Sequence, residues 1–391
     1  MDTPKIQVLK PTYRVDECLD AIRECLECGW TGLGFKTIEF EAAWKTYTGL
    51  PHAHFLNSAT AGLHLAIKIL KDAHGWQEGD EIITTPLTFV STNHAILYER
   101  LFPVFADVDP YNLCLDPASV EAQITTRTRA VMYVGMGGHT GNLNQIRDIC
   151  KKHGLKLILD AAHMAGTKVG VGPTVNENYQ HVGDEADVSV FSFQAVKNLP
   201  TADGGMICFR DAEFDARARK LSWLGIDKDT FLRSSQGGSY KWKYDVPDVG
   251  FKYHGNSIMA ALGLVALKYL DEDNDRRRKL FEVYRGELAD TEGLRLASAD
   301  TCHLYSRHLA QVIIPEKRDY VLNELNEDGV YPGVHYIDNT NYRMYRHALN
   351  TCPEAHRLSD ELLTLPLHLG MTDEDAVRVA TLIKEALSRE S

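Results

Sequence analysis

The strongest constraint on the fold is a regular alternation of short apolar runs with helical patterns between residues 81 and 209. The sequence predicts strands at 81–85, 101–107, 129–134, 156–160, 188–191 and 205–209. Helices are expected between them at 89–99 and 142–153. Strands that alternate with helices are typical of a mostly parallel sheet, because parallel neighbours need a crossover connection. The chain is therefore expected to be an α/β protein with helices on both faces of its central sheet.

The segments on either side of this alternation extend the prediction to the whole chain. Three helical patterns come first, at 16–28, 37–47 and within 57–73. After about residue 260 the pattern changes to a long helix at 259–288, a strand at 308–315, and helices at 318–328 and 372–388. With 391 residues the chain is long enough for two lobes. We expect a large domain over residues 1–260 and a smaller C-terminal α+β domain over 261–391.

Two charged residues stand at predicted strand ends. Asp160 follows the apolar run 157–159, and Lys197 comes shortly after the strand-like run 187–190. Ligands of open α/β sheets bind at the carboxyl ends of the strands. A lysine and an acid at that edge fit pyridoxal phosphate, which needs an amine for its Schiff base and a carboxylate to keep its ring nitrogen protonated. Either residue alone would more often be a surface lysine or a helix cap.

Composition and charge exclude several other classes of protein. A net charge of −12 argues against general nucleic-acid binding, which needs a concentrated basic face. No apolar run approaches the ~18 residues of a membrane helix, and the N-terminus lacks a signal-peptide pattern, so the cytoplasm is expected. The cysteines are scattered, and the pair Cys25 and Cys28 falls within a predicted helix, so no metal site is expected.

Several further motifs accompany Asp160 and Lys197 in a consistent order. They occupy residues 28–34, 57–66, 160–163, 191–198, 203–205, 333–336 and 365–368. In this order the motifs resemble those of the DegT/DnrJ/EryC1/StrS family of sugar aminotransferases, over nearly the whole chain. The family consists of fold-type-I enzymes that depend on pyridoxal phosphate. The resemblance implies that Lys197 forms the Schiff base and later moves a proton, and that Asp160 pairs with the pyridinium nitrogen.

The resemblance also implies the other contacts of the cofactor. They fall on Thr60, Ala61, Phe89, His163 and Ser192. Thr60 and Ala61 lie at a predicted helix start, where free backbone N–H groups favour a phosphate, and Ser192 matches its hydroxyl contact. Phe89 matches the aromatic residue that stacks on the ring, and His163 the residue beside the phenolic oxygen. Without the resemblance, Phe89 would be assigned to the core and His163 to a structural role.

The resemblance implies a homodimer in which one residue reaches the partner's cofactor phosphate. That position holds Lys252 here, where many family members have asparagine. A lysine can serve the same role because it adds a charge-assisted contact; the alternative is an exposed loop lysine. The substrate contacts are expected at Trp30 and Thr31 in the N-terminal loop, and at His335 and Tyr336.

The function implied is transfer of an amino group from an amino acid, with L-glutamate as the expected donor, to the keto group of a nucleotide-linked sugar. Pyridoxamine phosphate would be the intermediate form, in the biosynthesis of deoxyamino sugars for cell-surface polysaccharides or antibiotics. Amination of a keto-cyclitol stays open. So does a family dehydratase, although its known branch replaces the lysine with histidine. A transcription regulator with an aminotransferase-like domain would need a DNA-binding module, for which the motifs leave no room.

Gly135 and residues 170–183 depart from the family pattern, and residues 233–243 carry a separate prediction. Gly135 stands where a histidine is common, which puts a substrate contact there in doubt. Residues 170–183 form a longer connection than usual and could reshape the rim of the site. Residues 233–243 are basic and carry two aromatics. This last segment is expected either to close over a substrate diphosphate or to be a solvated loop.

Overall fold

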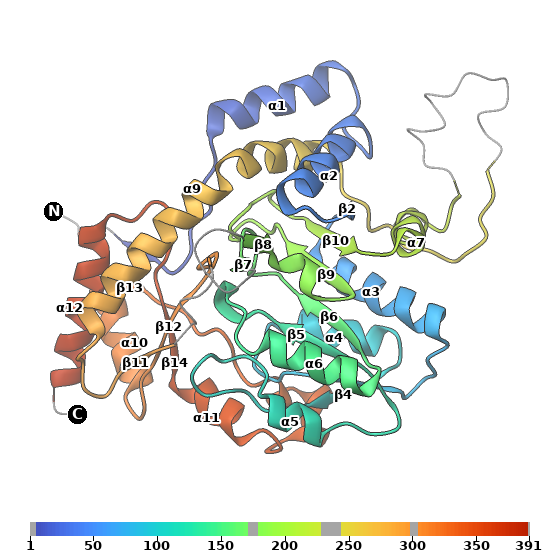
Figure 1. Ribbon diagram of the computed structural model, residues 1–391. Coiled ribbons are helices and arrows are strands. Elements are labelled where there is room, and N and C mark those ends of the chain that lie inside the picture. The colour runs from blue at the N-terminus through green and yellow to red at the C-terminus, as the bar shows by residue number, and fades with distance from the viewer. Residues whose placement is uncertain (1–4, 171–178, 228–243, 298–303, 390–391) are drawn as a thin grey trace.

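The computed structural model describes residues 5–170, 179–227, 244–297 and 304–389, and its centre is a seven-stranded sheet (Figure 1). The strands are β2 (His52–Leu56), β3 (Glu81–Thr84), β4 (Phe102–Phe105), β5 (Thr128–Val134), β6 (Lys156–Asp160), β9 (Val188–Ser192) and β10 (Gly205–Phe209). Their order is β2-β10-β9-β6-β5-β3-β4. Strand β10 runs antiparallel to both neighbours, and the other pairs are parallel. The prediction of a mostly parallel sheet is confirmed.

Helices cover both faces of this sheet because its strands are apolar on both sides. In β6, Leu157 and Leu159 belong to one core cluster and Ile158 to another, as the alternation of side chains along a strand requires. The first cluster includes residues of α2 (Phe35–Thr48), α5 (Pro117–Ala122), α6 (Leu143–His153) and α9 (Ser257–Leu288). The second includes residues of α3 (Ala59–His74), α4 (Ser91–Tyr98) and α7 (Ala212–Ser222).

The C-terminal part has its own small sheet and core. Strands β11 (Arg295–Leu296), β12 (Ala310–Ile313) and β14 (Leu362–Leu365) pair antiparallel. Helices α10 (Arg318–Glu327), α11 (Pro353–Glu361) and α12 (Asp373–Ser388) accompany them. The remaining elements are α1 (Val15–Glu27), β7 (Lys168–Gly170), β8 (Tyr179–His181) and the 3-10 turns Met136–Gly138, Val182–Glu185, Asn339–Asn341 and Arg343–Ala348. Figure 1 shows α9 connecting the two parts, since it packs against α1, α2 and α12.

The N-terminal segment reaches across to the C-terminal part. Strand β1 (Ile6–Gln7) pairs in parallel with β13 (Val330–Tyr331), and Ile6 is buried in the C-terminal core cluster. The division of the chain at residue 260 stays a prediction. Among the described residues, no helix combines the length and the apolar character needed to cross a membrane.

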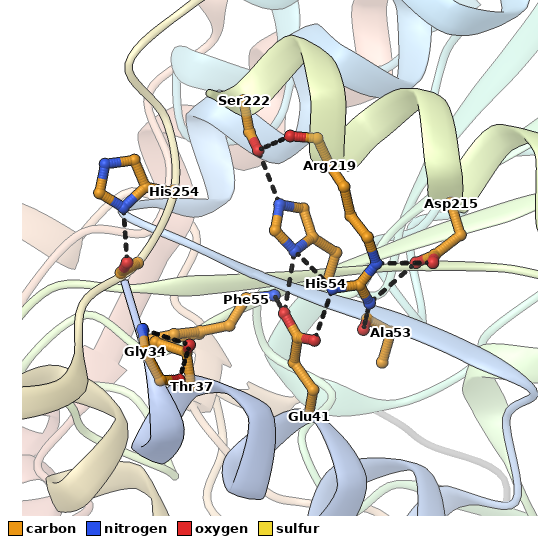
Figure 2. A network of polar contacts seen from close by, with 11 residues as sticks. Gly34, Thr37, Glu41, Ala53, His54, Phe55, Asp215, Arg219, Ser222 and His254 are labelled. Carbon is orange, nitrogen blue, oxygen red and sulfur yellow. Dashed lines mark hydrogen bonds and ion pairs between the residues drawn. The ribbon is translucent and has the colours of Figure 1, made fainter. Parts of the chain in front are cut away.

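A buried carboxylate joins α2 to the edge strand β2 and to α7 (Figure 2). Glu41 accepts hydrogen bonds from the backbone N–H of Phe55 at 2.8 Å and from Arg219 at 2.7 Å, and its Oε1 lies 2.9 Å from His54 Nδ1. Arg219 also donates to the carbonyl oxygen of Ala53 at 2.8 Å. Burial raises the pKa of Glu41, but the hydrogen bond with His54 and the charges of His54 and Arg219 outweigh it, so the pKa is lowered. The carboxylate is therefore compensated and fixes α2 against the sheet.

Candidate active site

A cavity of about 630 Å³ lies at the carboxyl ends of β6 and β9, bounded by both parts of the chain. Of the residues singled out in the sequence, those that line it are Thr60, Phe89, Asp160, His163, Ser192, Lys197, His335 and Tyr336. The structure thus brings together groups that lie more than 270 positions apart in the sequence, between Thr60 and Tyr336. The position agrees with the rule that ligands bind where parallel strands end.

Asp160, the last residue of β6, is held in one orientation by two donors. Its Oδ2 accepts a hydrogen bond from the hydroxyl of Thr92 at 2.7 Å, and its Oδ1 accepts one from the backbone N–H of Ala162 at 3.1 Å. Burial raises the pKa of this carboxyl, and these hydrogen bonds together with the charge of Lys197 oppose the rise only in part. A buried carboxylate of this kind has a strong preference for a cationic N–H partner in the cavity.

Lys197 lies in the turn that follows β9, and its amine is enclosed in the same cavity. Burial lowers the pKa of Lys197 to about 8, and the charge of Asp160 works in the opposite direction. About a tenth of the amine is therefore neutral at pH 7, far more than for an ordinary lysine, and both nucleophilic attack and proton abstraction require the neutral form. The Nζ atom lies 3.3 Å from Nε2 of His308.

His163 and Tyr336 form a pair whose proton positions follow from the backbone. The N–H of Gly137 donates to Nδ1 of His163 at 3.3 Å, so the ring proton of the neutral histidine must be on Nε2. Nε2 lies 3.0 Å from the hydroxyl oxygen of Tyr336 and donates to it. Burial, together with the charge of Lys197, lowers the pKa of His163 well below its usual value. The hydroxyl proton of Tyr336 is left for another acceptor in the cavity.

The start of α3 lies along one side of the cavity. Ser58 caps the helix, and its hydroxyl accepts the N–H of Ala61 at 3.2 Å. Ala61 is consequently buried behind the turn and does not line the cavity, whereas Ser58, Ala59 and Thr60 do. Free N–H groups at a helix start favour a phosphate. An amine, a buried carboxylate and this helix start in one cavity fit pyridoxal phosphate.

Besides Ala61, three residues named in the sequence lie outside this cavity. Trp30 donates from its ring N–H to the carbonyl oxygen of Leu33 at 2.7 Å, and the carbonyl of Thr31 accepts the N–H of Ser257 at 3.2 Å. Lys252 is exposed, with its Nζ 3.3 Å from the ring centre of Trp223. Their substrate and partner roles stay predictions. Residues 171–178, within the long connection, and 233–243 lie outside the described part of the chain.

The glycine at 135 has a local packing reason. A Cβ atom placed on Gly135 would lie 2.0 Å from the sulfur of Met164, so the histidine common in the family does not fit beside this methionine. Sequence reasoning missed two other groups at the site. Thr92 holds Asp160, and His308 contacts Lys197. Thr92 lies one helical turn after Thr88, on a face that looks like ordinary core in the sequence.

Comparisons with known proteins show the family of the chain. The model of the DegT/DnrJ/EryC1/StrS aminotransferase family matches residues 13–384. The spore coat polysaccharide biosynthesis protein SpsC of Bacillus subtilis (strain 168) is 33% identical over 379 residues, which cover 94% of each chain.

Solved structures show the same fold. The aminotransferase TlmJ from Streptoalloteichus hindustanus superposes with a TM-score of 0.89 at 32% identity, covering 98% of this chain and 99% of that one. DesI, solved in the presence of its TDP-sugar product, has a TM-score of 0.84 at 30% identity, covering 100% and 94%. These matches confirm the fold-type-I architecture, and the family model spans nearly the whole chain. The chain belongs to the DegT/DnrJ/EryC1/StrS aminotransferase family, whose members depend on pyridoxal phosphate.

Proposed function

We propose that this protein transfers an amino group from an amino acid, L-glutamate, to the keto group of a nucleotide-linked sugar. The observation that carries the proposal is that Lys197 and Asp160 line one cavity together with the start of α3. The relatives support the choice of substrate: SpsC is named for polysaccharide biosynthesis, and DesI was solved with a TDP-sugar product. Amination of a keto-cyclitol is the alternative that the same cavity would also allow.

Bound pyridoxal phosphate would supply an electron sink for the pair of electrons released when a substrate carbon loses its proton. Lys197 would hold the cofactor through its amine and, once freed by the substrate, take and return that proton. Asp160 would keep the ring nitrogen protonated, while Thr60 and Ser192 anchor the phosphate. Phe89 lies at the mouth of the cavity, with its ring 6.1 Å from that of Tyr336, where an aromatic face can cover the cofactor ring.

Borohydride reduction of the purified protein should place a pyridoxyl group on Lys197, because the buried amine of this residue is the one that faces the cavity together with Asp160. Peptide mass mapping reads out the modified residue. Lys168 and Lys252, which lie outside the cavity, serve as internal controls and should be unmodified. A pyridoxyl group on another lysine, or on none, would remove the basis of the proposed function.

The substrate class is tested with the pyridoxamine form of the protein. Single-turnover conversion of the cofactor is followed by absorbance with nucleotide-linked keto-sugars, the same sugars without a nucleotide, and a keto-cyclitol. Conversion is expected with a nucleotide-linked sugar and should be much slower with the free sugar. Equal rates with and without the nucleotide, or conversion of the cyclitol alone, would contradict a nucleotide-sugar substrate. Loss of a sugar hydroxyl without amination would indicate the dehydratase reaction.

We also propose that the active unit is a homodimer in which Lys252 completes the phosphate site of the partner. The backbone carbonyl of Lys252 accepts a hydrogen bond from the side chain of Asn57 at 3.1 Å, so its segment runs beside the turn that begins α3. The rings of Phe251 and Tyr253 stack at 4.8 Å next to it. Within its own chain the Lys252 amine lies over the ring of Trp223 and outside the cavity.

Mixing two inactive variants, Lys197→Ala and Lys252→Ala, tests this arrangement. If Lys252 acts in the partner's site, a mixed dimer has one site with both changes and one site with neither. Up to about half of the sites in mixed dimers then regain activity, as two-fold symmetry requires. Native mass spectrometry verifies subunit exchange. Zero activity after verified exchange would mean that Lys252 does not act across an interface.

A further inference from the structure

His308 contacts the amine of Lys197. On its other side the ring contacts the buried amide of Asn198, which in turn contacts a second buried amide. Its Nδ1 lies 2.9 Å from Oδ1 of Asn198. The amide nitrogen of Asn198 lies 2.7 Å from Oδ1 of Asn274 and 2.8 Å from the backbone oxygen of Ser306. The amide nitrogen of Asn274 donates in turn to the backbone oxygen of Ala165 at 3.0 Å. The chain of contacts therefore links the loop after β9, the long helix α9 and the segment that leads into β12.

The backbone oxygens at both ends fix every hydrogen in this chain. A carbonyl oxygen only accepts, so the amide nitrogens of Asn198 and Asn274 must face Ser306 and Ala165. The amide oxygen of Asn198 then faces His308, and Nδ1 of His308 must carry the ring proton. The other nitrogen, Nε2, presents a lone pair to Lys197 at 3.3 Å. The side chains of His308, Asn198 and Asn274 are almost fully buried, so water does not compete for these contacts.

We propose that His308, fixed in its Nδ1–H form by Asn198 and Asn274, is the positioning residue for the amine of Lys197 whenever that amine is free. A neutral amine has two N–H bonds and one lone pair. When one N–H donates to His308, the lone pair is directed away from the imidazole and into the cavity. The catalytic meaning rests on the proposed transamination, in which Lys197 must take a proton from a substrate carbon at that point.

His308 suits this role because it stays neutral where Lys197 titrates. Burial lowers the pKa of His308 well below its usual value, and the charges of Lys197 and Arg277 lower it further. A protonated His308 would donate to the lone pair of the neutral amine, and it would repel the ammonium. On the sheet side of Lys197 lies the carboxylate of Asp160, whose charge favours the ammonium form. Across neutral and mildly basic pH, His308 acts as an acceptor.

The first test locates the ring proton of His308 in the full-length chain freed of small molecules. Nitrogen NMR of protein labelled with ¹⁵N-histidine distinguishes a protonated from an unprotonated ring nitrogen, and the His308→Gln variant identifies the signals by their loss. Nδ1 is expected to be protonated and Nε2 unprotonated at neutral pH. The opposite tautomer, or a doubly protonated ring, would overturn the proposal.

The second test measures the pH dependence of Lys197 labelling by an amine reagent, quantified by peptide mass spectrometry. In His308→Leu the ammonium loses its acceptor, so the midpoint of labelling should fall by about one pH unit. His308→Gln keeps an oxygen acceptor near the position of Nε2 and should restore most of that shift. His181→Leu, at another buried histidine that packs on Trp44, is the matched control and should leave the midpoint unchanged. Equal midpoints for the leucine and glutamine variants would overturn the proposal.

Both tests omit cofactor and sugar, so their outcome is separate from that of the proposed function. If the nitrogen signals and labelling midpoints agree with expectation while no sugar is aminated, the proposed function fails and the role of His308 in placing the amine stands. If sugars are aminated but the midpoints do not move, only the role of His308 fails.

Discussion

Replacing Lys197 with alanine should lower the rate of amino transfer by about 100- to 10,000-fold, the range that a positioned proton-transfer group contributes. Under the proposed function, the variant would lose both the covalent attachment of the cofactor and the amine that moves the proton. It should still fold, because the Lys197 side chain faces a cavity, where its amine contacts the buried ring of His308. Single-turnover kinetics with the donor amino acid measure the effect.

The matched control is Lys168→Ala. Lys168 forms an ion pair with Asp271 at 2.8 Å on the surface and does not line the cavity, so this variant should keep nearly full activity. Added small primary amines should restore part of the activity of Lys197→Ala, because they can enter the space that the side chain leaves. Activity of Lys197→Ala within tenfold of the parent protein would exclude Lys197 as the proton-transfer group.

Replacing Asp160 with asparagine should slow the chemical step by about 100- to 1,000-fold, which corresponds to roughly 3–4 kcal/mol of lost charge stabilisation in the transition state. The local contacts can survive the change. The asparagine oxygen can accept the N–H of Ala162, and its amide can donate to Thr92, whose hydroxyl is 3.0 Å from that of Thr88 and can turn toward it. The loss should therefore appear in turnover and not in folding.

The same substitution at Asp187 is the control for Asp160→Asn. Asp187 directly precedes β9, at the end of the strands away from Asp160. There it accepts a hydrogen bond from the backbone N–H of Leu157 at 2.9 Å. Asp187→Asn should leave the rate of the chemical step unchanged. Asp160→Asn should retain the cofactor, which its absorbance in the purified protein reports. Near-normal single-turnover rates in Asp160→Asn would show that this carboxylate is not the partner of the ring nitrogen.

The central strands could be predicted because burial on both faces leaves a continuous apolar run, as in residues 156–160. Strand β2 was missed, since two of its five residues are histidines. His54 is buried in β2 because Glu41 and Ser222 lie 2.9 and 2.7 Å from its ring nitrogens, and both partners are distant in the sequence. The short elements α5, α7, α11 and β14 were also missed. The local pattern of apolar residues indicates which segments are buried. It does not indicate which distant residue will contact a buried polar side chain after folding.

Some residues of the candidate site could likewise be predicted from the sequence, and others could not. Asp160 and Lys197 could be identified because each follows a predicted strand and their order matches a known family. His308 could not, since its contact with Lys197 spans 111 positions and depends on Asn274 of α9, a residue that looks like part of a polar helix surface in the sequence. The position of Ala61 behind the turn that begins α3 likewise depends on the helix cap made by Ser58. The sequence motif alone does not indicate this cap.

The arrangement of the strands has a consequence for the order in which the protein can mature. Every strand of the main sheet lies between residues 52 and 209, so a chain still being synthesised already carries the complete sheet well before its last third has left the ribosome. His308, His335 and Tyr336, which enclose the amine of Lys197, are made later. We therefore expect Lys197 to be uncovered on a half-made chain. It would acquire its burial, and with it its lowered pKa, only when the C-terminal part docks.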